Sequence, residues 1–349
     1  MESGAQNGTE TIFPYRCSCG HTAALSLDGH RARCPACAGS VPTSPEGVLQ
    51  FFEGRTAQNE YFDKLYDEGK FHALDQHTAS RTYESTAHVA QTYLQLCGCD
   101  LSLGLTDAAI LDVACGTGWV TAGLLAHPGV RRCRFHAFDI SAAGPAALVE
   151  FARAAAGSNR VETSVQDAAA MLFGDASFDF ILGSSVLHHF TDVERFLADC
   201  RRLLKPSGVA TFGEPFAVGY GIGVAAVALA QKQLRTRHAA VERLYEDIGV
   251  RVRGEADALA RLVDKHLFLH STFYEMARRV GFHQVEFVPL ATREFYRNHF
   301  IGELLAEQGL RDERLAALAN EIYRTFFDLF DAGSYGHSVA AFLQVVLHA

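Results

Sequence analysis

Five apolar segments alternate with helix-like segments between residues 108 and 216 of this 349-residue chain. Each apolar segment is short and nearly continuous, as in strands that are covered on both faces. Segments with apolar residues at helical spacing separate them. A chain with this alternation folds as a parallel sheet with helices on both faces. The expected strands are 108–115, 132–140, 161–166, 178–186 and 208–216.

The first expected strand ends in two glycines, Gly116 and Gly118, and a helical pattern follows at once. Glycine lets the chain turn sharply and lets a ligand approach the backbone. The N-terminus of the following helix favours an anionic group such as a carboxylate. Asp139 ends the second strand, 21 residues after Gly118, where a carboxylate can accept hydrogen bonds from a ribose. A nucleoside-containing ligand is therefore expected at these strand ends.

Two details argue against a dinucleotide. The pattern G-x-G-x-x-G would place its third glycine at position 121, which is Thr121. Asp112 lies in the first strand just ahead of the turn, where a carboxylate would attract an ammonium group and repel a pyrophosphate. A nucleoside ligand that carries an ammonium group fits both observations better.

Residues 112–118, "DVACGTG", resemble motif I of the class I S-adenosylmethionine-dependent methyltransferases, with Ala114 in place of the motif's first glycine. Other segments resemble later motifs of the family in the same order: "FDIS", "QDA", "FDFILGSSVLHHF" and "LLKPSGVATF". The resemblance covers roughly residues 106–216, and 271–292 and 337–349 fit the last two strands. It implies an α/β, Rossmann-like fold with a seven-stranded, mostly parallel sheet whose last strand is antiparallel to the others.

The resemblance also implies the cofactor S-adenosylmethionine. The residues expected around it are Asp112, Ala114, Gly116, Gly118, Asp139, Ile140, Asp167, Ala168 and Ser184. Structural roles remain open for the acids: Asp112 or Asp167 could cap a helix, and Asp139 could be a surface acid at a strand end.

Three residues near the expected methyl group are candidates for a catalytic role: His188, His189 and Glu214. A histidine titrates near neutral pH and can serve as a general base. A base helps only if the acceptor carries a proton of high pKa, because the sulfonium methyl is already activated. The alternative is that these side chains only pack or orient the loop.

Four of the nine cysteines fall within 21 residues near the N-terminus. They are Cys17, Cys19, Cys34 and Cys37. Two such pairs on short turns can supply the tetrahedral ligand set of zinc. The first pair has the spacing C-x-C, so a role for His21 or His30 in place of a cysteine stays open. The cluster resembles the N-terminal zinc ribbon of some methyltransferases. The alternative is a tail with unliganded thiols.

A joint rich in Pro, Ser and Gly, "AGSVPTSPEG", follows the cysteine cluster. We therefore expect three parts in the chain. They are a zinc-ribbon-like module over 1–48, a helical lid segment over 49–105, and a methyltransferase core over 106–349 with helical insertions at 217–270 and 293–335.

The expected acceptor pocket lies between the core and the segments 51–97 and 217–300, which are rich in aromatic residues. This composition favours a small, largely apolar or aromatic acceptor, as in secondary metabolism. One alternative is a ribosomal RNA methyltransferase guided by its zinc ribbon. Another is a protein of this fold that binds the cofactor without transferring methyl groups.

The charge of the chain argues against a nucleic-acid partner. The formal net charge is −9, and residues 1–50 hold three basic and four acidic side chains. The apolar segment 217–230 is too short to span a membrane. With no early signal-peptide pattern, we expect a cytoplasmic protein. The oligomeric state stays open.

Overall fold

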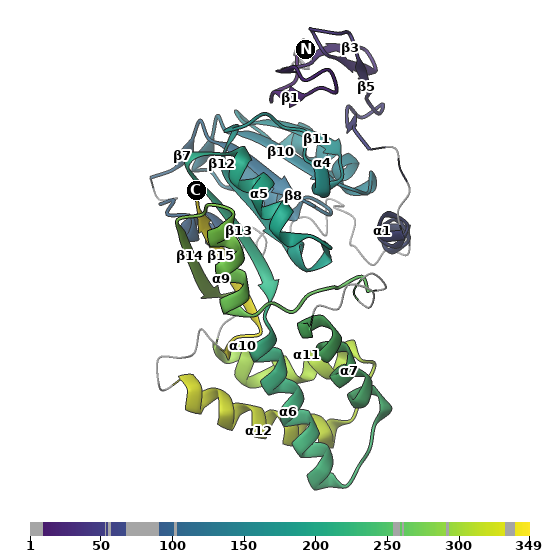
Figure 1. The fold of residues 1–349 in the computed structure, drawn as a ribbon, viewed down its shortest axis with the longest axis vertical. Coiled ribbons are helices and arrows are strands. Elements are labelled where there is room, and N and C mark those ends of the chain that lie inside the picture. Colours follow the sequence, from purple (N-terminus) through teal and green to yellow (C-terminus); the bar gives the residue numbers. More distant parts are fainter. Residues whose placement is uncertain are drawn as a thin grey trace.

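The computed structural model describes residues 10–52, 54, 57–67, 91–100, 103–253, 259, 262–290, 293–331 and 339–349. A small β module at the N-terminus sits on one end of an α/β core, and a group of helices extends from the opposite end (Figure 1). None of the described helices is both long and apolar enough to span a bilayer.

The core is built on an eight-stranded sheet with the order β14-β15-β13-β12-β8-β10-β11-β6. Strands β6, β11, β10, β8, β12 and β13 run parallel, whereas β15 is antiparallel to both β13 and β14. The seven strands implied by the resemblance are all present, and the short β6 adds an eighth. The bounds are β6 Leu49–Gln50, β8 Ala109–Val113, β10 Arg134–Asp139, β11 Arg160–Val165, β12 Phe178–Ser184, β13 Leu204–Pro215, β14 Gln284–Pro289 and β15 Phe342–His348.

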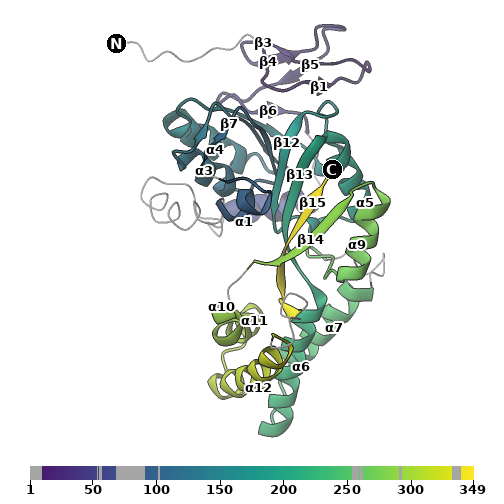
Figure 2. The same cartoon turned by 90° about the vertical axis from the view of Figure 1, so that its left-hand side faces the viewer.

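Helices cover both faces of the sheet, α3 and α4 on one side and α5 and α9 on the other (Figure 2). All residues of β8 are buried, as expected for a strand with helices on both faces. Helix α5 begins where the Asp192 side chain accepts a hydrogen bond from the Arg195 amide at 2.9 Å. The bounds are α3 Trp119–Ala126, α4 Ala143–Ala155, α5 Val193–Leu203 and α9 His270–Arg279.

The N-terminal β strands form what we call the cysteine module, residues 10–48. Its chain leads into β6, which pairs in parallel with β11 at the edge of the main sheet. The module also reaches the core through Tyr15, which bridges to Phe173, and through Arg16, which pairs with Asp175 at 2.7 Å. The strands of the module are β1 Tyr15–Arg16, β2 Thr22–Ala23, β3 Ser26–Asp28, β4 Arg31–Arg33 and β5 Ser40–Pro42. A separate pair, β7 Leu105–Thr106 and β9 Val130–Arg131, lies beside the core sheet.

A buried polar network joins the module to the sheet. The Tyr15 hydroxyl donates to Glu162 at 2.5 Å and lies 3.1 Å from His136 Nδ1. The amide of Ile12 donates to the second oxygen of Glu162 at 2.8 Å. Tyr15 and His136 are fully buried, so these bonds satisfy groups that water cannot reach.

The group of helices at the opposite end follows directly from β13, and we call it the helical subdomain. It comprises α6 Ala217–Leu234, α7 Ala239–Arg253, α10 Arg293–Asn298, α11 Phe300–Glu307 and α12 Glu313–Asp331. Helix α6 packs on α12 and passes very close to the start of β15: a Cβ on Gly219 would lie 2.3 Å from the amide nitrogen of Ala341. A glycine at this position is therefore needed for the close approach.

Residues 262–268, which we call the strap, lead from the helical subdomain back to the core. The amide of Phe268 donates to the carbonyl oxygen of Pro215, the last residue of β13, at 3.2 Å. Its carbonyl oxygen accepts from the amide of Ala217, the first residue of α6, at 2.8 Å. The segment 51–97 was expected to be helical. It holds helix α1 Ala57–Asp67, whereas residues 68–90 lie outside the described part of the chain.

Candidate active site

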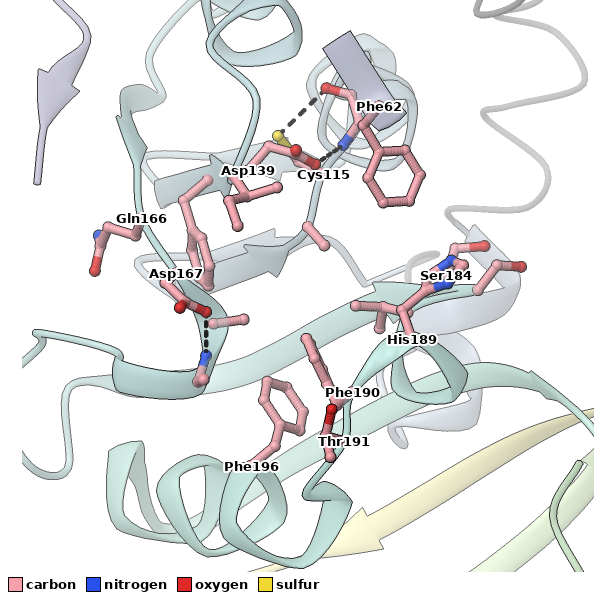
Figure 3. A pocket seen from close by; sticks show the side chains of 18 of the residues that line it. Phe62, Cys115, Asp139, Gln166, Asp167, Ser184, His189, Phe190, Thr191 and Phe196 are labelled. Atoms are coloured by element: carbon pink, nitrogen blue, oxygen red, sulfur yellow. Dashed lines mark hydrogen bonds between the residues drawn. The ribbon is translucent and has the colours of Figure 1, made fainter. Parts of the chain in front are cut away.

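A cavity of about 600 Å³, within the usual range for ligand pockets, opens at the carboxyl ends of β8, β10, β11 and β12 (Figure 3). This is where open α/β sheets bind their ligands. Helix α1 contributes to the lining from outside the sheet. The described lining comprises residues 62, 66, 114–117, 119, 138–140, 166–169, 184–186, 189–192, 195 and 196.

The turn between β8 and α3 forms one wall. Gly116 and Gly118 have positive φ angles of 55° and 77°, a conformation that side chains disfavour. A third glycine, which the sequence reasoning missed, supports the turn from α4: a Cβ on Gly144 would lie 1.7 Å from the carbonyl oxygen of Gly116. The turn thus leaves bare backbone at the cavity, as its glycines predicted.

Asp139 stands at the end of β10 and lines the cavity. Its two carboxylate oxygens accept backbone hydrogen bonds from Gly116 and Ser141, each at 2.9 Å. Burial raises the pKa of this carboxyl, while the backbone donors oppose the shift. The carboxylate therefore ties the glycine turn to the next strand and keeps free lone pairs for a ligand's hydroxyl groups.

The loop after β11 supplies a second polar edge. Asp167 accepts a hydrogen bond from the Ala169 amide at 2.8 Å through one oxygen, so it caps a short 3₁₀ turn and still lines the cavity. Gln166 is almost fully buried, and its side chain donates to Ser164 and accepts from the Leu172 amide. Sequence reasoning singled out Asp167 and Ala168 as site residues but did not include Gln166, although it begins the same "QDA" segment.

Two of the nine residues expected around the cofactor do not line the cavity, Asp112 and Gly118, whereas the other seven do. The carboxylate of Asp112 accepts hydrogen bonds from the Thr121 hydroxyl at 2.7 Å and from the Thr121 amide at 3.2 Å. Burial raises the pKa of Asp112 to about 6. The side chain thus holds the first turn of α3 against β8, behind the cavity wall.

Helix α1 is fastened over the loop that follows β10. The Asn59 side chain donates to the carbonyl oxygen of Ile140 at 3.0 Å, and Asp63 accepts from the Ser141 hydroxyl at 2.6 Å. These bonds bring Phe62 and Tyr66 into the lining. Burial raises the pKa of the Tyr66 hydroxyl, with Asp139 acting in the same direction. The aromatic residues in this segment were the signal that predicted a lid.

Residues 185–190, which we call the histidine loop, follow β12. Glu214, on the neighbouring β13, is fully buried and accepts hydrogen bonds from the amides of Val186 and Leu187 at 2.9 and 2.8 Å. Its other oxygen lies 2.7 Å from Nδ1 of His188. Neither Glu214 nor His188 is part of the described cavity lining, so this pair holds the loop in place from behind.

His189 is the one of the three catalytic candidates that lines the cavity. Its Nδ1 lies 3.1 Å from the carbonyl oxygen of Val263 in the strap. The ring of Phe62 meets the imidazole edge to face, with a centroid distance of 5.4 Å. No described residue of 217–300 lines this cavity; the strap reaches the site only through the histidine loop.

The four clustered cysteines form a second candidate site. They precede in the sequence all the described residues that line the cavity. Their sulfur atoms all lie within 4.8 Å of one another, with 3.6 Å between Cys17 and Cys37 and 3.9 Å between Cys19 and Cys34. Sulfur atoms bound tetrahedrally to zinc at about 2.3 Å are spaced similarly. Within the described residues, this group contains neither His21 nor His30.

The fold and the cavity define a class of protein: an open α/β sheet with a ligand-sized cavity at the carboxyl ends of its strands. Comparison with known proteins identifies the core more closely. Residues 111–212 match the family model described as a methyltransferase domain. The chain therefore contains a methyltransferase domain of the class I, Rossmann-like type, as the motifs predicted.

Curated relatives match part of the chain. Malonyl-[acyl-carrier protein] O-methyltransferase of Hahella chejuensis is 28% identical over 139 residues, 37% of this chain and 47% of that protein. The enzyme of the same name from Halorhodospira halophila is 32% identical over 107 residues, 30% of this chain and 35% of that protein. The chain thus spans less than half the length of these relatives.

Among solved structures, phosphoethanolamine N-methyltransferase 2 of Haemonchus contortus, in complex with S-adenosyl-L-methionine, aligns with a TM-score of 0.47. The identity is 16%, and the alignment covers 86% of this chain and 61% of that chain.

Proposed function

We propose that the protein transfers the methyl group of S-adenosylmethionine to a small, largely apolar or aromatic molecule, as in secondary metabolism. The observation that carries the proposal is one cavity whose lining combines bare backbone and carboxylates with aromatic side chains and a histidine. The bare backbone and the carboxylates of Asp139 and Asp167 suit the ribose and adenine of the cofactor, and Tyr66 lies close to this glycine turn. Phe62 packs on the ring of His189.

In this proposal each wall of the cavity has a task. The glycine turn and the N-terminus of α3 receive the carboxylate of the cofactor's amino-acid part. Asp139 receives the ribose hydroxyls, and Ile140 and Ala168 flank the base. Helix α1 closes over the bound cofactor and excludes water, because methyl transfer needs alignment of the reactants more than chemical activation.

The charges in the lining support a small molecule over RNA. Among the described lining residues, Asp139, Asp167 and Asp192 are acidic, whereas Arg195 is the one side chain with a permanent positive charge. A phosphate backbone would meet repulsion in such a cavity. The cysteine module supplies no excess of basic residues either, and in this proposal its four thiolates hold a structural zinc ion.

Calorimetry with S-adenosylmethionine tests the cofactor assignment. Gly116→Val should reduce affinity by about 100-fold or more, because a branched side chain would fill the space next to the bound cofactor and strain a positive φ angle. Gly157→Val is the matched control, since Gly157 has nearly the same φ, 57°, but lies at the surface with no neighbour near its Cβ position. Equal affinity in a folded Gly116→Val protein would contradict the assignment.

Methyl transfer from labelled cofactor tests the acceptor class. The protein is incubated with total RNA and, separately, with a small-molecule extract, and the label is followed in each. Label in the extract is expected. Label in RNA, at a rate that falls steeply with salt, would favour a ribosomal RNA methyltransferase. Cofactor binding without label in either would favour a non-transferring protein of this fold.

A further inference from the structure

The imidazole of His189 is oriented by two acceptors on the strap. Its Nδ1 lies 3.1 Å from the carbonyl oxygen of Val263 and 3.3 Å from a carboxylate oxygen of Asp264. Both partners accept hydrogen bonds, so Nδ1 carries the proton and donates it. In the neutral ring, the lone pair is then on Nε2.

The position of the His189 ring places its Nε2 lone pair on the side of the cavity. His189 lines the cavity, whereas Val263 and Asp264 are not among its described lining residues. Since Nδ1 is engaged with the strap, Nε2 is the polar atom that the ring can offer to the cavity. The ring of Phe62 packs edge to face on the imidazole and restricts its rotation.

The surroundings of His189 favour its neutral form, in which Nε2 carries a lone pair. Burial, and next the neighbouring His188, lower the pKa of His189. Asp264 and Glu214, together with the Val263 carbonyl, act in the opposite direction. Among the described residues, these groups shift the pKa of His189, and Phe62 of helix α1 packs on its ring.

His188 has a different task from its neighbour. Its Nδ1 is bound to the buried Glu214 at 2.7 Å, and its backbone carbonyl accepts the amide of Lys265 at 2.6 Å. His266 binds the carbonyl of Phe190 at 2.9 Å through Nε2. The histidine loop is therefore held between β13 on one side and the strap on the other.

We infer that Asp264 positions His189 as the general base of methyl transfer, and that the acceptor therefore carries a dissociable proton. The inference rests on the proposed function and names its substrate class: a hydroxyl, phenol or similarly protic group on an apolar body. His189 acts on the acceptor, whereas Asp264 acts through His189 and is a positioning residue.

The acceptor oxygen forms a bond to the methyl carbon while the bond between that carbon and sulfur breaks, and its electron pair stays on sulfur. Nε2 of His189 takes the acceptor's proton. The products are a methyl ether, neutral S-adenosylhomocysteine and an imidazolium, whose charge the Asp264 carboxylate stabilises.

Nitrogen NMR of the imidazoles tests the geometry without any substrate. His189→Gln identifies the resonance, and we expect the Nδ1-protonated tautomer in the unmodified protein. Asp264→Asn should lower the pKa of His189, because it removes a negative charge. Asp312→Asn is the matched control: Asp312 pairs with His238 at the same distance, 3.3 Å, in the helical subdomain. A His189 proton on Nε2, or a pKa unmoved by Asp264→Asn, would overturn the inference.

Kinetics with the acceptor isolated from the labelled extract test the chemistry. We expect kcat to fall by about 100-fold in His189→Gln and by about 10-fold in Asp264→Asn, with KM little changed. The acid limb of the kcat profile should move to lower pH in Asp264→Asn, which a purely structural role would not cause. Asp312→Asn should match the unmodified protein.

Three outcomes would reject the inference and leave the proposed function standing. The first is unchanged turnover in both variants. The second is a labelled product that is a methyl ester or a sulfonium, because a carboxylate or thioether has no proton to lose. The third is activity that chelators abolish and a divalent cation restores, since His188, His189 and Asp264 also lie within 4.8 Å as potential ligands. Absence of cofactor binding would instead reject the proposed function itself.

Discussion

The cysteine module and the helical subdomain are attached to the same sheet by different chemistry. The module is joined through buried polar groups, with Tyr15, His136 and Glu162 at its centre. The helical subdomain is joined through close packing of backbone, with Gly219 of α6 against Ala341. The attachment of the module therefore includes titratable groups in addition to the packing of Phe13 on Phe178, whereas the contact at Gly219 contains no titratable group. The strap that follows the helical subdomain contacts the histidine loop, where the amide of Lys265 donates to the carbonyl oxygen of His188 at 2.6 Å.

The largest expected effect concerns the proposed zinc site of the module. Cys34→Ser should remove the zinc ion and unfold the module, because a structural zinc supplies on the order of 10 kcal/mol of binding free energy. Elemental analysis measures the zinc content, and the rate of proteolytic cleavage within residues 10–48 measures unfolding of the module. Cys99→Ser, outside the cluster, is the control. Unchanged proteolysis in a Cys34→Ser protein that has lost its zinc would show that the module keeps its fold without the metal.

The next effect tests attachment by close packing. Gly219→Ala should lower the free energy of unfolding by about 2–3 kcal/mol, because its Cβ would collide with the backbone of β15. Gly221→Ala in the same helix meets no neighbour within 4 Å. It should stabilise the protein by about 0.5–1 kcal/mol. Chemical denaturation measures both, and equal effects would show that the contact at Gly219 is unimportant.

Glu162→Gln tests the polar attachment. The substitution removes the charge that accepts hydrogen bonds from Tyr15 and Ile12, so we expect a loss of about 1–2 kcal/mol of unfolding free energy. Glu286→Gln, at a partly exposed position of β14, serves as the control for the loss of a carboxylate. If Glu162→Gln and Glu286→Gln lower the free energy of unfolding by the same small amount, the polar network does not hold the module.

The smallest effect is a pH dependence that only the polar attachment should show. Burial lowers the pKa of His136 in the folded protein, so the folded state disfavours its protonation. The stability that neutral His136 provides is present above its unfolded pKa and is lost as the pH falls below about 6.5. Between about pH 7.5 and 5.5 the unmodified protein should lose about 1 kcal/mol more than His136→Gln. Parallel curves for the two proteins would contradict this assignment.

Local patterns were enough to predict the strands of the core and the glycine turn at the cavity. Gly116 and Asp139 were found because motif and strand end coincide in a short stretch of sequence. Glycines that serve distant segments were not found. Gly144 is required by the carbonyl of Gly116 and Gly219 by β15, and no periodicity within a helix reveals either contact.

At the candidate site, too, contacts between residues far apart in the sequence could not be predicted. Asp264 lies 75 residues after His189 in the chain, in a segment without regular structure, so nothing nearby in the sequence relates the two. Strand β6 has only two residues, too few for alternation to be visible. The aromatic residues of 51–97 indicated that this segment contributes to the cavity. Which of them line it depends on the hydrogen bonds by which Asn59 and Asp63 hold α1 against the loop after β10.

The place of β15 between β13 and β14 has a consequence for how the chain assembles during synthesis. Strand β14 has β15 as its neighbour in the sheet, yet α10, α11 and α12 are made between the two. Until β15 emerges, β13 presents an unpaired edge to the solvent, which is a hazard for aggregation. A ribosome-bound chain that stops after residue 331 should therefore bind chaperones far more strongly than one carrying the full 349 residues.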